Sequence, residues 1–134
     1  MLSRRTRYAM LALAKLSRNY GRGSVSITEI AQSEMIPKRF LENILLRLKK
    51  EGILRSERGK SGGYCLAVPP GDVSIFKIMN IFEGMEMLEC MNASDCYECE
   101  FCKKAGSCKI RKTFIYVREN IYAILKSTTI KDLE

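Results

Sequence analysis

Five cysteines lie within nineteen consecutive residues, from Cys90 to Cys108. Short, flexible spacings of this kind allow several thiolates to meet one metal ion or an iron–sulfur cluster. Carboxylates in and beside the same stretch add to the repulsion between thiolates, and a bound cation or cluster would offset that charge. The stretch therefore predicts a metal or redox centre, surrounded by the acidic residues Glu86, Glu89, Asp95, Glu98 and Glu100.

Four interpretations of these cysteines stay open: an iron–sulfur cluster, a zinc ion, a thiol–disulfide switch, or no chemistry at all. The run Cys96-x-x-Cys99-x-x-Cys102 brings three sulfurs within reach of one ion or cluster. Zinc has no redox chemistry, so a zinc site predicts a protein that binds its partner constitutively. A cluster can be lost, oxidised or nitrosylated, which suits a sensor. We favour the cluster, and both the 2Fe-2S and the 4Fe-4S types stay open.

Charge is distributed unevenly over the 134 residues, which carry a formal net charge of +8. Residues 1–71 contain fourteen Lys and Arg against five Asp and Glu, whereas residues 72–134 contain nine against ten. A basic front half predicts a polyanionic partner such as double-stranded DNA. No apolar run approaches about eighteen residues, so we expect no transmembrane helix and no membrane partner. The apolar run near the N-terminus is stopped at Lys15 and no small-residue cleavage site follows, so we expect no signal peptide and a cytoplasmic location. Thiols stay reduced there, which favours metal binding or redox chemistry over structural disulfides.

Two helices in the front half are predicted to form a helix-turn-helix. Ser26-Ile27-Thr28-Glu29 has the form of a capping box and predicts a short helix to about Glu34. Pro37 predicts the first turn of a longer helix that ends near Gly52. A first helix, capped by Ser3, precedes them. The expected core stripe of the longer helix is Phe40, Leu41, Ile44, Leu45 and Leu48.

A hairpin is predicted directly after the longer helix. Residues 53–58 and 64–67 form the expected strands, and a glycine-rich tip joins them. A hairpin in this position is a wing, whose backbone and cations can approach a DNA groove closely. Cys65 stands alone in the second strand, and we expect it to be a small core residue.

Two more helices are predicted beyond the wing. Ser74 caps a helix that ends at Gly84 and is expected to pack the wing against the first helix. The last helix starts near Lys109, and its apolar residues recur at intervals of 4, 3, 4 and 3, which is a heptad seam. We expect this seam to form a two-fold homodimer, and the alternative is that it folds back onto the first helix. The seam residues are Ile110, Phe114, Val117, Ile121 and Ile124.

The predicted DNA-binding residues come from three places: the start of the first helix, the helix-turn-helix and the wing. The N-terminal residues of the second helix of such a motif reach base edges. Glu42 accepts a hydrogen bond from cytosine in one interpretation, and pairs with a nearby Lys or Arg in the other. The complete set is Arg4, Arg5, Ser26, Lys38, Arg39, Glu42, Asn43, Arg58, Lys60, Ser61 and Gly62.

Several sequence pieces resemble the Rrf-type winged helix-turn-helix transcriptional regulators (IscR-, NsrR- and CymR-like proteins). The pieces are RYA, IPxxFLE and RGxxGGYxLA, and the likeness covers nearly the whole chain. The resemblance implies a mainly α fold with a small β wing and a long C-terminal dimerisation helix. It implies a regulator of transcription rather than an enzyme. It also implies that Glu42 tunes the choice of DNA sequence.

The resemblance also implies a ligand set. Cluster-binding members of this family use three cysteines, each pair separated by five residues, with an aromatic residue six after the third. Cys96, Cys102 and Cys108 fit this pattern, because Phe114 supplies the aromatic residue. The alternative set Cys90, Cys96 and Cys102 has the same spacing, but no aromatic residue lies six positions after its third cysteine. The chain has no histidine, and Arg111 stands where the iron–sulfur assembly regulators have one, so Cys90 and Cys99 are the candidate fourth ligands.

Three regions are therefore expected: a winged helix-turn-helix domain at 1–84, a cysteine-rich loop at 85–108, and a dimerisation helix with its tail at 109–134. The expected function is that of a dimeric DNA-binding regulator which senses iron–sulfur or redox status and binds a palindromic operator. The competing functions are a zinc-stabilised or thiol–disulfide regulator without a cluster, and an iron–sulfur electron carrier or scaffold. Nothing indicates an enzyme, since there is no glycine-rich phosphate loop and no nucleophile beside a base.

Overall fold

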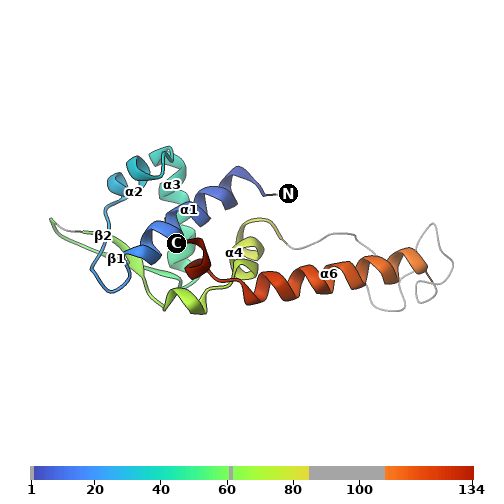
Figure 1. Ribbon diagram of the computed structural model, residues 1–134. Helices are drawn as coiled ribbons and strands as arrows, with labels where there is room; N and C mark the ends of the chain where they lie inside the picture. The colour runs from blue at the N-terminus through green and yellow to red at the C-terminus, as the bar shows by residue number, and fades with distance from the viewer. Residues whose placement is uncertain (1, 61, 85–107) are drawn as a thin grey trace.

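The computed structural model describes residues 2–60, 62–84 and 108–134. A cluster of helices surrounds α1, the two strands form a hairpin beside it, and α6 extends away from this body (Figure 1). The predicted mainly α fold with a small β wing is confirmed. In chain order the elements are α1 (Arg4–Arg18), α2 (Ile27–Ser33), α3 (Lys38–Lys50), β1 (Leu54–Glu57), β2 (Gly63–Leu66), η1 (Pro70–Asp72), α4 (Ile75–Phe82), α6 (Lys109–Ser127) and η3 (Ile130–Leu133).

Serine side chains start three of the helices, because each hydroxyl satisfies a backbone N–H that has no partner within its helix. Ser3 Oγ accepts from the N–H of Thr6 at 3.2 Å. Ser26 and Ser74 do the same for α2 and α4, at 3.1 and 3.2 Å. Pro37 lies one residue earlier than predicted, as the N-cap of α3 rather than within its first turn.

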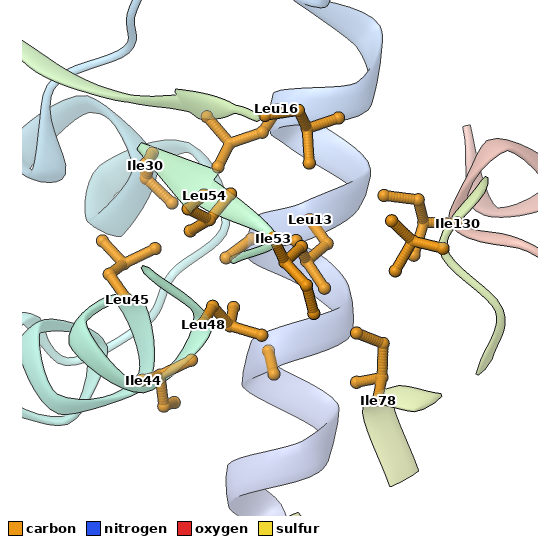
Figure 2. Packing of buried hydrophobic residues seen from close by; sticks show 14 of the residues in the cluster. Leu13, Leu16, Ile30, Ile44, Leu45, Leu48, Ile53, Leu54, Ile78 and Ile130 are labelled. Carbon is orange, nitrogen blue, oxygen red and sulfur yellow. The ribbon is translucent and has the colours of Figure 1, made fainter. Parts of the chain in front are cut away.

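The core forms where α1 meets α3, α4 and the C-terminal turn η3 (Figure 2). Burial of each Leu or Ile side chain in such a core contributes about 1.5–3 kcal/mol. The predicted stripe of α3 is buried at four of its five positions. Phe40 is the exception: it is 50% exposed, so its assignment to the core was wrong. The fully buried side chains include Leu13, Ile30, Leu41, Leu45, Leu48, Ile53, Ile78 and Ile130.

The C-terminal turn fastens one end of α6 to the body. The N–H of Ile130 donates to Val73 O at 2.9 Å, and the N–H of Ile75 donates to Thr128 O at 2.8 Å. The Ser17 hydroxyl donates to the Glu134 carboxylate. From this attachment α6 runs outward, so its N-terminal end lies away from the body (Figure 1).

The helix α4 packs against α1 and α6. Phe76 and Tyr122 meet edge to face with ring centroids 4.9 Å apart, and Lys126 Nζ lies 4.9 Å from the Phe76 centroid. The predicted packing of α4 against α1 is therefore observed, the contact with α6 was not predicted, and β2 contacts α1 directly. Within the described ranges, no helix combines the length and the apolar character that crossing a membrane requires.

Candidate nucleic-acid interface

The helix α3 presents its first two turns to solvent. Its buried stripe fixes the rotation of the helix, and the opposite face is left exposed. Lys38, Arg39, Glu42 and Asn43 all lie on that exposed face. The second helix of a helix-turn-helix uses this region to enter the major groove. The structure therefore brings these four predicted residues together on one surface.

The turn between α2 and α3 sets the angle at which α3 leaves the body. Met35 follows the C-cap residue Glu34 and has a positive φ of 52°. The next N–H, that of Ile36, donates to Ala31 O at 2.9 Å, which closes a Schellman motif. The Ile36 side chain is buried, whereas Met35 is 87% exposed. Local backbone hydrogen bonding and the buried Ile36 side chain thus set the direction of α3.

Glu42 has no salt bridge within the described part of the chain, and its side chain is exposed. The pairing with a neighbouring Lys or Arg that would have neutralised it is therefore not observed there. A carboxylate on a DNA-facing surface repels phosphates unless it accepts a hydrogen bond from a base. The geometry leaves Glu42 available for such a bond.

The wing forms from β1 and β2, which pair antiparallel with Arg55 opposite Cys65. Arg58 and Lys60 are exposed at its tip, and Gly62 closes the tip through its N–H to Gly59 O at 2.9 Å. A Cβ atom on Gly62 would lie 2.8 Å from two carbonyl oxygens, so this tight turn requires glycine. Ser61 lies outside the described residues.

Cys65 is partly exposed rather than a core residue, which corrects the prediction. Arg55 Nε donates to its sulfur at 3.1 Å from the facing strand. The alternation of the strand places Leu66, rather than Cys65, in the core. Ser26 is exposed and caps α2 close to the wing, since Val25 next to it bridges to Tyr64.

Arg4 and Arg5 are exposed in the first turn of α1. They line a hollow of about 750 Å³ between α1, α3 and α4, together with Tyr8, Phe40 and Arg47. Arg39 stacks over the Phe40 ring at 5.8 Å. The sequence analysis did not predict that Phe40 and Arg47 line this hollow. The spacing of apolar residues alone had assigned Phe40 to the core.

Cys108 is the N-cap residue of α6, and its sulfur accepts from the N–H of Arg111 at 3.5 Å. Arg111 is buried, with 8% of its surface exposed. Among the described residues, no group of three or more His, Cys, Asp or Glu side chains converges on one point. The other predicted ligands, Cys90, Cys96, Cys99 and Cys102, lie outside the described residues.

The predicted seam residues of α6 carry large exposed apolar side chains. Their exposed fractions run from 38% for Val117 and Ile121 to 67% for Ile110. The seam does not fold back onto α1 as core, because α6 meets the body through α4 and the C-terminal turn. The seam also includes Phe114 and Ile124.

The helix-turn-helix, the wing and the basic surface define a winged-helix DNA-binding protein. The sequence profile of the Rrf2 family, described as an iron-dependent transcriptional regulator, matches residues 2–134. An rrf2-like HTH-type transcriptional regulator of Rhodobacter capsulatus is 38% identical over 137 residues, which cover 99% of this chain and 91% of that protein. This chain belongs to the Rrf2 family of transcriptional regulators, whose members are not enzymes.

Two solved structures show the same fold. CymR, the global cysteine regulator of B. subtilis, superposes with a TM-score of 0.78 at 27% identity, over 99% of this chain and 95% of that one. The IscR of T. potens superposes with a TM-score of 0.76 at 26% identity, over 99% of this chain and 85% of that one.

Proposed function

We propose that this chain is a homodimeric DNA-binding regulator that senses iron–sulfur or redox status through the segment from Cys90 to Cys108. The observation that carries the proposal is the position of Cys108 at the outer end of α6, whose other end is fastened to the DNA-reading body. A helix of nineteen residues is a rigid rod of about 28 Å. A change in what Cys108 binds therefore reaches the body.

Cys108 is chemically suited to be a metal ligand. The N-terminal N–H groups of a helix favour negative charge, and the Cys108 sulfur already accepts from one of them. Cys96 and Cys102 are the proposed second and third ligands, with Cys90 or Cys99 as the fourth. An iron–sulfur cluster held there would supply a group that iron shortage or oxidants remove.

The exposed seam of α6 is the proposed dimer surface. A second copy of the same helix would cover its five apolar side chains, and two-fold dimers are the commonest oligomers. A two-fold pair would place the two recognition helices for half-sites about 34–36 Å apart on one face of DNA. We therefore propose a palindromic operator.

DNA contact is proposed through α3, the wing tip and the start of α1. Lys38, Arg39, Glu42 and Asn43 would face the major groove. Arg58 and Lys60, with Ser61 and Gly62, would follow the adjacent backbone or groove, and Arg4 and Arg5 would meet phosphates. Binding of this kind weakens with salt, with a slope of about −0.9 per phosphate contacted.

A second candidate is a thiol-based regulator that holds no cluster. The close superposition on CymR, a cysteine regulator by name, favours this candidate over an electron carrier or a scaffold. In that case the clustered cysteines would exchange between thiol and disulfide, or hold zinc, and no visible chromophore would form.

The test is the visible spectrum of anaerobically purified protein, with iron and sulfide analysis. The proposal predicts a brown protein with charge-transfer bands that Cys102→Ala removes. Cys65→Ala is the matched control, because Cys65 lies on the wing, and it should leave the bands unchanged. A colourless protein, with zinc or without metal, would replace the first candidate with the second.

A further inference from the structure

Glu83 joins two parts of the chain that are eighty residues apart. It is the C-cap residue of α4, and its Oε1 accepts from the backbone N–H of Ser3 at 2.7 Å. The same oxygen accepts from the hydroxyl of Thr6. Ser3 and Thr6 also contact each other through their hydroxyl oxygens at 3.1 Å. One carboxylate therefore holds the N-cap and the first turn of α1.

The hydrogen bonds to Glu83 favour its charged form. Thr6 is fully buried, so if the carboxylate moved away its hydroxyl would keep Ser3 Oγ as a partner but would lose the stronger bond to a charged acceptor. The hydrogen bonds from Thr6 and Ser3 lower the pKa of Glu83 below its ordinary value. Hydrogen bonds to an ionised acceptor are about twice as strong as neutral ones. The hydrogen bonds from Ser3 and Thr6 therefore stabilise the charged Glu83 carboxylate at the start of α1.

The attachment lies between the two regions that the proposed function must connect. Arg4 and Arg5 follow Ser3 directly, in the turn that Glu83 holds. On the other side, Gly84 follows Glu83, and the predicted cysteine-rich loop at 85–108 begins one residue later. Glu83 is therefore bonded to the start of α1 and lies two positions before that loop in the sequence.

A second attachment holds the opposite end of α1. There the Ser17 hydroxyl donates to the Glu134 carboxylate, beside the C-terminal turn. The fifteen residues of α1 separate the two attachments by about 20 Å. The Glu83 attachment thus lies at the end of α1 that carries Arg4 and Arg5, and the Glu134 attachment lies at the other end.

We infer that Glu83 is a positioning residue for DNA binding, which transmits the state of the cysteine segment to Arg4 and Arg5 through Ser3 and Thr6. The inference rests on the proposed function, because it needs a sensed state to transmit. Glu83 itself touches neither the DNA nor the metal ligands in this scheme.

The test compares operator binding by the full-length protein as purified anaerobically and after its metal is removed with a chelator. Coupling between two sites commonly changes affinity by about 5- to 150-fold, and we expect a ratio in that range for the unsubstituted protein. Glu83→Ala removes both hydrogen bonds and should bring the ratio below about twofold. Thr6→Val removes the hydroxyl bond and leaves the bond from Ser3 N–H, so it should lower the ratio part of the way. Glu134→Ala, which removes a carboxylate of the same charge at the far end of α1, should leave the ratio unchanged.

Glu83→Gln is a milder second variant for the case that Glu83→Ala does not fold, because its amide keeps an oxygen that accepts hydrogen bonds. It should show a ratio between those of the unsubstituted protein and of Glu83→Ala. An unchanged ratio in Thr6→Val and Glu83→Gln would overturn the inference alone. A ratio of one in the unsubstituted protein would overturn the proposed function as well.

Discussion

Tyr64 and Val25 exchange two backbone hydrogen bonds, at 2.8 and 2.9 Å, and thereby fasten the wing to the segment that precedes α2. Gly63 makes this approach possible. A Cβ atom at position 63 would lie 2.1 Å from the carbonyl oxygen of Val25. The glycine is therefore required by the closeness of two backbones, and the wing is bonded to the segment before α2 rather than being a free hairpin.

Gly63→Ala should destabilise the protein by about 1–3 kcal/mol, the usual cost of forcing an atom into a packed site. It should also weaken DNA binding, because the wing is displaced. Gly71→Ala is the control, since nothing lies within 4 Å of a Cβ atom there, and its effect should stay within about 0.5 kcal/mol. Urea unfolding measures the stability of both variants. Equal unfolding midpoints for Gly63→Ala and Gly71→Ala would show that the close contact at Gly63 is not needed.

Met35→Gly should stabilise the protein. A residue with a side chain costs about 1–2 kcal/mol in the left-handed conformation that Met35 adopts, while glycine loses about 0.5–1 kcal/mol more backbone entropy on folding. The net gain should be roughly 0.5–1 kcal/mol, seen as a higher urea midpoint. Met35→Ala keeps the strained conformation and should give no such gain. A lower midpoint for Met35→Gly would show that the exposed methionine makes a stabilising contact.

Glu83 should make folding stability depend on pH. Because hydrogen bonds from Thr6 and Ser3 lower its pKa in the folded state, its contribution is complete above the ordinary carboxyl pKa of 4.5 and is lost as the pH falls through the lower, folded value. The stability difference between the unsubstituted protein and Glu83→Gln should therefore be largest near neutral pH and shrink in acid. Urea titrations at several pH values measure it, and a difference that grows in acid would have the wrong sign.

Ile121→Glu should separate the proposed dimer, because a charge would be buried in the apolar seam. Self-association should weaken by at least about tenfold, which corresponds to about 1.4 kcal/mol. Asn120→Glu introduces the same charge at the neighbouring exposed position outside the seam, and it should leave the dimer intact. Sedimentation velocity over a range of concentrations distinguishes the two. Dissociation by both variants, or by neither, would show that the seam is not the interface.

Glu42→Ala should relax sequence preference rather than simply weaken binding. The loss of one base-specific hydrogen bond should reduce discrimination at a single operator position by about 1–3 kcal/mol. Glu51→Ala is the control, because Glu51 lies at the other end of α3 in an ion pair with Arg47. Binding-site selection from random DNA measures the sequence preference of both variants. Identical preferred sequences for Glu42→Ala and the unsubstituted protein would show that Glu42 does not recognise a base.

Much of the fold could be predicted because its signals are local. Serine caps, the positive-φ glycines at 52 and 84, and the apolar spacing of α3 all act within a few residues. The predictions failed where burial depends on distant neighbours. Phe40 faces a hollow formed with α1 and α4, and Cys65 faces Arg55 on the wing surface. The attachment of Glu83 to Thr6 spans seventy-seven residues and leaves no local pattern.

The cysteine segment was predicted from residue type and spacing, and only Cys108 of its five cysteines lies within the described residues. Its place as the N-cap of α6 gives a physical reason for a thiolate at that end of the helix. The exposed seam of α6 likewise agrees with the heptad spacing, while the dimer itself stays a prediction.

The decisive measurement is the dissociation constant of the operator for anaerobically purified protein and for Cys108→Ala, in one buffer at one salt concentration. Since Cys108 begins the helix that is fastened to the DNA-reading body, the two constants should differ by at least about fivefold. Equal constants and equal footprints would contradict the link between the clustered thiols and DNA binding.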